Sequence, residues 1–155
     1  MKRDYFDSEP RSNEEIDGKP CRTCVDFKTW AKLTGKSGAK RGKNCPLDKD
    51  QLGRNTWSFL HTMAAYFPDR PTDEQQRDMK TFINLFSKFY PCEYCAKDMQ
   101  VDIANDPPKT GSRSDLSLWF CNLHNKVNKK LGKPLFDCSK VDQRWFHGWD
   151  DGSCS

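Results

Sequence analysis

The chain has 155 residues with a net charge of +4, and 35% of its residues are hydrophobic, which supports one domain with its own core. No apolar run approaches the roughly 20 residues that a membrane-spanning helix needs. Residues 1–17 mix acids and bases and lack the apolar segment of a secretory signal, so an integral membrane protein is disfavoured and no cleavable leader is expected.

The first predicted feature is a tethered reactive arm. Residues 1–20 are polar and are expected to be disordered. They lead to two cysteines, Cys21 and Cys24, separated by an arginine and a threonine. The apolar side chains of residues 25–30 could dock lightly or recognise a partner, but they are too few to form a core.

A flexible linker is predicted over residues 33–44, where glycines alternate with lysines. Residues 1–44 hold 11 basic and 7 acidic side chains, whereas residues 45–155 hold 15 of each. The basic excess could contact nucleic acid or anionic lipid, but a solvated linker is favoured because the rest of the chain adds no basic stripe. We therefore expect neither a nucleic acid partner nor membrane insertion. The basic residues concerned are Lys28, Lys32, Lys36, Lys40, Arg41 and Lys43.

Two helices are predicted between the linker and the central cysteines. Asp48 or Asp50 opens the first helix, and a proline stops it. The second begins at a capping box formed by Thr72 and Gln75. The side chains predicted to be buried are Leu52, Phe59, Leu60, Met63, Ala64 and Phe67 in the first helix, and Met79, Phe82, Ile83, Phe86 and Phe89 in the second.

Three further helices follow in the sequence. The third is predicted over residues 92–105, the fourth over residues 114–131 with Gly132 closing it, and a short fifth over residues 139–145, which fades at Gly148. No strand-like alternation of apolar and polar residues is present.

These elements predict an all-α fold. Residues 1–44 form the flexible N-terminal arm, and residues 45–155 form a four-helix bundle with a short fifth helix appended.

The central motif places Cys92 and Cys95 at the predicted start of the third helix, just after Pro91. Cysteines at this spacing can close a readily reduced disulfide, and the positive end of a helix favours the thiolate, the nucleophile of thiol–disulfide exchange. A redox centre is therefore favoured. Half of a zinc site stays an alternative, because Cys-x-x-Cys also fits tetrahedral Zn²⁺.

A zinc site built from both Cys-x-x-Cys pairs is disfavoured. The two pairs are separated by 67 residues, against the 15 to 20 that are usual in a compact zinc ribbon. No metal is expected.

The remaining cysteines have different sequence settings. Eight cysteines in a short chain suggest an oxidising compartment or deliberate redox chemistry. A disulfide between Cys121 and Cys138 would close a loop of about 17 residues and attach the short fifth helix to the bundle, contributing roughly 3 kcal/mol. Cys45 and Cys154 lie at opposite edges of the domain.

Oxidation of thiols by oxygen requires a cofactor, because cysteine alone has no two-electron route to O₂. The chain has no Gly-x-Gly-x-x-Gly loop after a strand. Two helix faces could instead hold a flat heteroaromatic ring by stacking and hydrogen bonds, although each residue alone could be an ordinary core or surface residue. The faces carry Arg54, Trp57 and His61, and Cys121, His124, Asn125 and Asn128.

Three segments resemble the Erv/ALR family of FAD-linked sulfhydryl oxidases. They are residues 52–57 with His61, residues 89–95, and residues 123–134, and the match runs in order from residue 45 to residue 154. The segment from residue 21 to residue 30 is similar to the arm of the family's longer forms.

The resemblance implies that the bundle holds FAD, with Cys95 next to the flavin and Cys92 exchanging with the arm. The FAD contacts that it implies are Gly53, Arg54, Trp57, His61, Tyr66, His124, Asn125, Val127, Asn128, Lys130, Lys133, Arg144 and Trp145.

The resemblance also implies the remaining disulfides and the assembly. Cys121 would pair with Cys138 within the chain. Cys45 of one subunit would pair with Cys154 of another in a disulfide-linked homodimer.

The implied reaction converts two thiols and O₂ into a disulfide and H₂O₂. Electrons would pass from a protein dithiol to Cys21 and Cys24, then to Cys92 and Cys95, then to FAD, and finally to O₂ or cytochrome c. The implied substrate is the import receptor of the mitochondrial intermembrane space, which is also the implied location, with cytosolic or secreted forms left open. A thioredoxin-like reductase, a zinc-binding adaptor and a helical signalling protein are the rival classes.

Overall fold

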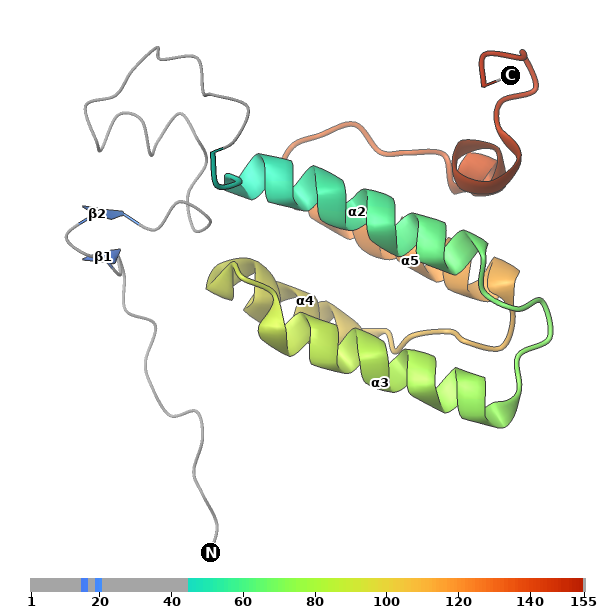
Figure 1. Ribbon diagram of the computed structural model, residues 1–155, viewed down its shortest axis with the longest axis horizontal. Helices are drawn as coiled ribbons and strands as arrows, with labels where there is room; N and C mark the ends of the chain where they lie inside the picture. Colours follow the sequence, from blue (N-terminus) through green and yellow to red (C-terminus); the bar gives the residue numbers. More distant parts are fainter. Residues whose placement is uncertain (1–14, 17–18, 21–44, 155) are drawn as a thin grey trace, which may run out of the picture. The chain divides into compact units, whose positions relative to one another are not determined.

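The computed structural model describes residues 15–16, 19–20 and 45–154. Within residues 45–154 it contains four α-helices, α2 (Lys49–Ala65), α3 (Asp73–Phe89), α4 (Glu93–Asn105) and α5 (Arg113–Lys130), and then a 3-10 helix, η1 (Cys138–Lys140), and a π-helix, η2 (Gln143–His147) (Figure 1). The predicted all-α class is confirmed for this part of the chain.

Two short strands lie in the segment that was expected to be disordered. Strand β1 (Glu15–Ile16) pairs antiparallel with β2 (Lys19–Pro20). Residues 21–44, with Cys21, Cys24 and the predicted linker, lie outside the described residues.

The helix starts follow local hydrogen bonding. Asp48, not Asp50, precedes α2 and accepts a hydrogen bond from the backbone N of Gln51 at 2.8 Å. Thr72 forms the predicted capping box, because its hydroxyl accepts from Gln75 N and its own N donates to the Gln75 side chain.

The fourth predicted helix begins slightly earlier than expected. Ser112 caps α5 by accepting from the backbone N of Asp115 at 3.0 Å, so Ser114 lies inside the first turn. Gly132, at a φ of 65°, follows the C-terminal end of α5 as predicted.

The core lies where the four helices meet, and all four contribute to it. The helices also contact one another through polar groups: Gln100 of α4 donates to the backbone O of Ser87 in α3, and Lys130 of α5 bonds Asp98 of α4. The buried apolar cluster is Leu60, Ala64, Phe67, Ile83, Ile103, Leu116, Trp119, Phe120 and Leu123, with Trp57, Met63, Met79, Phe86 and Met99 packed against it.

Three predicted core residues lie at the surface instead. Phe59 is 55% exposed, Phe82 is 36% exposed and Phe89 is 80% exposed. Each side chain continues an apolar stripe in the sequence, but it lies at the edge of that stripe and keeps more than a third of its surface exposed. Periodicity identified the apolar positions and overestimated the width of the buried face.

The predicted fifth helix is divided between η1 and η2. Gly148 ends η2 with a φ of 85°, and a Cβ at this position would lie 3.0 Å from the Cβ of Cys154. Both the backbone angle and the space therefore require glycine here. Among the described helices, none combines the length and apolar character needed to cross a bilayer.

Candidate redox and cofactor site

The central cysteine pair forms a disulfide at the N-terminal end of α4. The Cα atoms of Cys92 and Cys95 are 5.2 Å apart. Cys92 is the N-cap residue, and its sulfur lies 3.4 Å from the backbone N of Cys95, which donates to it. A thiolate formed at Cys92 would therefore be stabilised by a backbone N–H and by the positive end of the helix.

The two sulfur-bearing residues differ in exposure. Cys92 is buried, with 1% of its surface exposed, whereas Cys95 is half-buried. Exchange at Cys92, which the family resemblance implies, therefore requires the turn around residues 90–93 to shift. Two nearby aromatic side chains are open to solvent: Phe89, which precedes the pair, is 80% exposed, and Tyr94, between the two cysteines in sequence, is 78% exposed.

Tyr90 places the redox turn near α2. Its half-buried side chain lies close enough to Thr56, the residue that precedes Trp57, for Thr56 to affect the pKa of the Tyr90 hydroxyl. Burial raises the pKa of the Tyr90 hydroxyl, and Thr56 opposes this shift. The redox turn thus lies near the helix that carries the predicted cofactor contacts Trp57 and His61.

Four aromatic rings gather between α2, α5 and η2. The ring of Trp57 stacks on that of His124, with centroids 4.0 Å apart and an interplanar angle of 6°. His61 stacks on Trp145, with centroids 4.8 Å apart and an angle of 9°. The two stacked pairs meet where His61 Nε2 lies 3.0 Å from His124 Nδ1. We call Trp57, His61, His124 and Trp145 the aromatic cluster.

Both histidines of the aromatic cluster are held neutral. Burial is the main cause that lowers the pKa of His61 to about 3, assisted by the nearby His124 and Arg144. Burial also lowers the pKa of His124 to about 4, with a further contribution from Lys133. Two neutral imidazoles in contact share one hydrogen bond, so one nitrogen donates and the other accepts.

One polar atom of the aromatic cluster lacks a partner. His61 is only 3% exposed, and its Nδ1 has no hydrogen bond to any described residue. Buried polar atoms are nearly always satisfied, so an orphaned one is expected to be completed by a bound group or water. Flat rings with a free polar atom suit a heteroaromatic ligand, which stacks and forms hydrogen bonds at its edge.

Cationic side chains lie beside the aromatic cluster. The guanidinium carbon of Arg144 is 4.3 Å from the ring centroid of Trp145, and Lys133 is near enough to His124 to affect its pKa. These are the groups that a pyrophosphate would need. Lys130 is already engaged, since its Nζ lies 2.7 Å from Asp98 and 2.8 Å from Asp102.

The bonds of Lys130 also set its protonation. Partial burial acts to lower the pKa of Lys130, but the bonds to Asp102 and Asp98 outweigh it and raise that pKa. In this structure Lys130 links the C-terminal end of α5 to α4.

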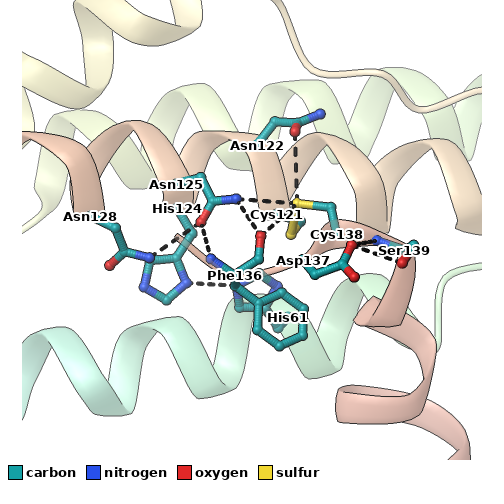
Figure 2. The surroundings of a disulfide bond; sticks show 10 residues. All are labelled: His61, Cys121, Asn122, His124, Asn125, Asn128, Phe136, Asp137, Cys138 and Ser139. Carbon is teal, nitrogen blue, oxygen red and sulfur yellow. Dashed lines mark hydrogen bonds between the residues drawn. A yellow bond between two sulfur atoms is a disulfide. The ribbon is translucent and has the colours of Figure 1, made fainter. Parts of the chain in front are cut away.

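A disulfide and an amide attach the C-terminal segment to α5 (Figure 2). Cys121 is bonded to Cys138, with Cα atoms 5.8 Å apart. The Asn125 side chain donates to the backbone O of Phe136 at 2.8 Å and accepts from its N at 2.9 Å. Asn128 donates to the Asn125 Oδ1 at 3.4 Å. Asn125, predicted as an FAD contact, thus already bonds backbone groups of its own chain.

The other predicted contacts are more dispersed. Gly53 and Arg54 lie in the first turns of α2, and apart from its chain neighbours and the backbone of its own helix nothing described lies within 4 Å of a Cβ built at Gly53. Tyr66 is 69% exposed and packs edge-to-face on Phe146. Val127 is half-buried in α5.

The cysteines at the edges of the domain are free. Cys45 and Cys154 are both exposed and reduced. In the described part of the chain, no three His, Cys, Asp or Glu side chains gather as metal ligands would.

Arg113 and Asp142, which form an ion pair beside η2, were not identified from the sequence. Arg113 forms a bidentate ion pair with Asp142, with its Nη1 2.8 Å from Oδ1 and its Nη2 3.2 Å from Oδ2. The available signal was a basic residue in the first turn of a helix, where it opposes the helix dipole and needs an acidic partner.

Comparison with known proteins identifies the family. Residues 54–146 match the sequence profile of the Erv1/Alr family. The chain is 42% identical to the mitochondrial FAD-linked sulfhydryl oxidase ERV1 of Saccharomyces cerevisiae, over 87% of either chain. It is 37% identical to the mitochondrial FAD-linked sulfhydryl oxidase erv1 of Schizosaccharomyces pombe, over 86% of this chain and 90% of that protein.

Solved structures agree with the sequence match. The crystal structure of the yeast Erv1 core is similar with a TM-score of 0.69 and 48% identity, covering 74% of this chain and 97% of that one. The FAD-binding domain of Erv1 from Saccharomyces cerevisiae is similar with a TM-score of 0.66 and 50% identity, covering 68% of this chain and all of that one. The chain that carries the Cys92–Cys95 disulfide and the aromatic cluster therefore belongs to the Erv1/Alr family.

Proposed function

We propose that this protein is an FAD-linked sulfhydryl oxidase, an enzyme that makes disulfides in other proteins. The observation that supports this most directly is the Cys92–Cys95 disulfide at a helix N-terminus, in a chain that also gathers the aromatic cluster around the buried His61. Relatives that share most of this chain are named FAD-linked sulfhydryl oxidases.

The residues of the aromatic cluster fit FAD. Trp57 and His124, with the His61 and Trp145 pair, offer flat faces for the cofactor's rings, and the orphaned His61 Nδ1 offers an edge contact. Arg144 and Lys133 supply positive charge for the pyrophosphate. When bound, FAD supplies the two-electron acceptor that a dithiol needs.

The chain's own residues carry out thiol–disulfide exchange. A substrate thiolate attacks one sulfur of the Cys92–Cys95 disulfide, an S–S bond forms to the substrate, and the other sulfur leaves as a thiolate. The second substrate thiolate then breaks that mixed disulfide, which leaves the substrate oxidised and Cys92 and Cys95 reduced. The N-terminus of α4 stabilises thiolate at Cys92, and this lowers the barrier when Cys92 is the leaving group.

Cys21 and Cys24 act as a shuttle between protein substrates and the central pair. This part of the proposal is supported by their spacing on a lysine- and glycine-rich segment. We keep Cys92 as the sulfur that exchanges with the shuttle and Cys95 as the one next to FAD. Because Cys92 is buried, arrival of the shuttle must displace the turn at residues 90–93.

The functional unit is a homodimer. The α3 side chains Phe82, Leu85 and Phe89 recur at positions i, i+3 and i+7 and are 36%, 47% and 80% exposed. A contiguous apolar face of this kind suits burial against a second copy of the chain. The exposed thiols of Cys45 and Cys154 would then form intersubunit disulfides.

The electron acceptor is O₂, giving H₂O₂, or cytochrome c. The protein acts in mitochondria, as its yeast relatives are named, and we propose the intermembrane space with its import receptor as substrate. Eight cysteines in a chain of 155 residues are consistent with an oxidising compartment.

The purified full-length protein tests the function directly. We expect a yellow protein whose bound flavin is released as FAD on denaturation, and which consumes O₂ when a dithiol is supplied. A colourless protein without dithiol-dependent O₂ uptake would refute the proposal.

A further inference from the structure

Arg113 occupies a position where a positive charge is unfavourable. It is the first residue of α5, and the N-terminal end of a helix carries partial positive charge. Its side chain is nevertheless only 16% exposed. Two carboxylates offset this placement, Asp142 through the bidentate pair and Asp69 through a bond of 3.0 Å to Nε.

Asp142 uses its carboxylate for Arg113 and not for its own helix. It is the N-cap residue of η2, yet its side chain makes no capping bond there. Arg113 also touches the far end of η2, since its guanidinium carbon is 4.7 Å from the ring centroid of Phe146. Arg113 therefore contacts η2 on both sides of Trp145.

Trp145 is the member of the aromatic cluster that η2 contributes. Its ring covers that of His61 at 4.8 Å, and His61 is almost fully buried. If η2 moved away, His61 and its unpartnered Nδ1 would become open to solvent. The position of η2 therefore decides whether this side of the cluster is closed.

We propose that Arg113 is a positioning residue for cofactor retention, which holds η2 through Asp142 and Phe146 so that Trp145 closes the FAD site over His61. The proposal rests on the proposed function. It assigns to a residue outside the predicted FAD contacts the task of keeping the cofactor bound.

Asp69 provides an internal control. It bonds the same arginine, but it lies in the loop between α2 and α3, and its side chain is 82% exposed. Loss of Asp69 should weaken the anchorage of Arg113 without releasing η2. If Arg113 only stabilised the fold in general, replacing Asp69 and replacing Asp142 should have similar effects on FAD release. The proposal predicts a larger effect for Asp142.

The experiment measures the rate of FAD release from the loaded full-length protein into a trap for free flavin. For Asp142→Asn and Arg113→Gln we expect release about tenfold faster, a change that corresponds to about 1.4 kcal/mol. Arg113→Lys should lie in between, because an ammonium group cannot form the bidentate pair. For Asp69→Asn we expect a change of at most about twofold, as for an exposed ion pair.

A second measurement does not depend on the cofactor. Hydrogen exchange of the peptide covering residues 138–149 in flavin-free protein reports whether η2 is held. We expect faster exchange in Asp142→Asn than in the wild type, and no change in Asp69→Asn. Ile103→Val is a core substitution in α4, far in sequence from the contact between Arg113 and Asp142. It should lower overall stability without selectively accelerating FAD release or hydrogen exchange of residues 138–149.

Several outcomes would overturn the inference. They are wild-type release rates in both Asp142→Asn and Arg113→Gln, equal effects of Asp69→Asn and Asp142→Asn, or an equal effect of Ile103→Val. If Arg113→Gln does not fold, Asp142→Asn decides alone. A wild-type protein that binds no flavin would refute the proposed function instead, and the hydrogen-exchange comparison would still test whether Arg113 holds η2.

Discussion

His61 Nε2 lies 3.0 Å from His124 Nδ1, and this contact joins two ring stacks from different parts of the chain. One stack connects α5 to Trp57 of α2, and the other connects α2 to Trp145 of η2. The hydrogen bond requires at least one imidazole to be neutral, because two imidazolium ions would repel each other and neither could accept it, and burial lowers the pKa of both rings so that both are neutral at pH 7.

Acidification is therefore expected to destabilise the flavin-free protein. The folded-state pKa values of about 3 for His61 and about 4 for His124 lie below the ordinary value of 6.5, so the unfolded state binds more protons below pH 6.5. Stability is fully present above that pH and is lost as the pH falls toward the folded-state values. The free energy of unfolding should fall by about 1.4 kcal/mol per pH unit for each histidine.

Urea unfolding at stepped pH measures this dependence. The window between about pH 6.5 and 5 is the most informative, because few carboxylates titrate there. His61→Gln and His124→Gln should each reduce the slope. A slope that is the same in the wild type and in both variants would contradict neutral burial of the pair.

The disulfide between Cys121 and Cys138 should contribute to stability more than to exchange chemistry. Its two cysteines are 17 positions apart in the sequence, and replacement of both by alanine should lower the free energy of unfolding by about 3 kcal/mol. Because Cys121 is 2% exposed, alanine is a better replacement than a polar residue. Denaturant unfolding gives the magnitude, and stability unchanged from the wild type would contradict the structural assignment.

The apolar face of α3 should control assembly. Phe89→Glu places a charge on the most exposed side chain of the face at 80% exposure, so we expect it to disrupt a homodimer when intersubunit disulfides are reduced. Glu93→Gln, an exposed substitution just beyond the face, serves as the control. Sedimentation under reducing conditions distinguishes the two. A dimer that survives Phe89→Glu would place the interface elsewhere.

The arm should matter for protein substrates and not for small ones. Replacement of Cys21 and Cys24 by serine is expected to leave oxidation of dithiothreitol nearly unchanged and to slow oxidation of a protein dithiol. Oxygen uptake with each substrate measures the difference. Equal loss on both substrates would refute a relay through the arm.

Much of the fold could be predicted because its signals are local. The capping box at Thr72 and the glycine after α5 are set by residues within four positions of the helix end. Apolar periodicity located α2, α3 and α5, and the flanking prolines located α4. The width of the buried face could not be read in this way. Phe82 and Phe89 are apolar and correctly spaced, but burial depends on whether another element or another subunit covers them.

For the candidate site too, features within one helix could be predicted from the sequence and contacts between helices could not. Helical spacing placed Trp57 with His61, and His124 with Asn125, on shared faces, but spacing within one helix says nothing about contacts between helices. The His61–His124 hydrogen bond, the stack on Trp145 and the Arg113–Asp142 pair all join residues more than 25 positions apart. Asn125 and Lys130 were predicted as FAD contacts, but their polar groups already bond Phe136 and Asp98, which spacing within α5 could not show.

The central claim is that electrons from thiols reach bound FAD through Cys95. Anaerobic addition of one equivalent of dithiothreitol to the purified protein, followed by its visible absorption, tests this most directly. We predict loss of the oxidised-flavin absorption in the wild type, and retention in a Cys95→Ser variant that still binds FAD. Equal bleaching in the variant, or none in the wild type, would contradict the account.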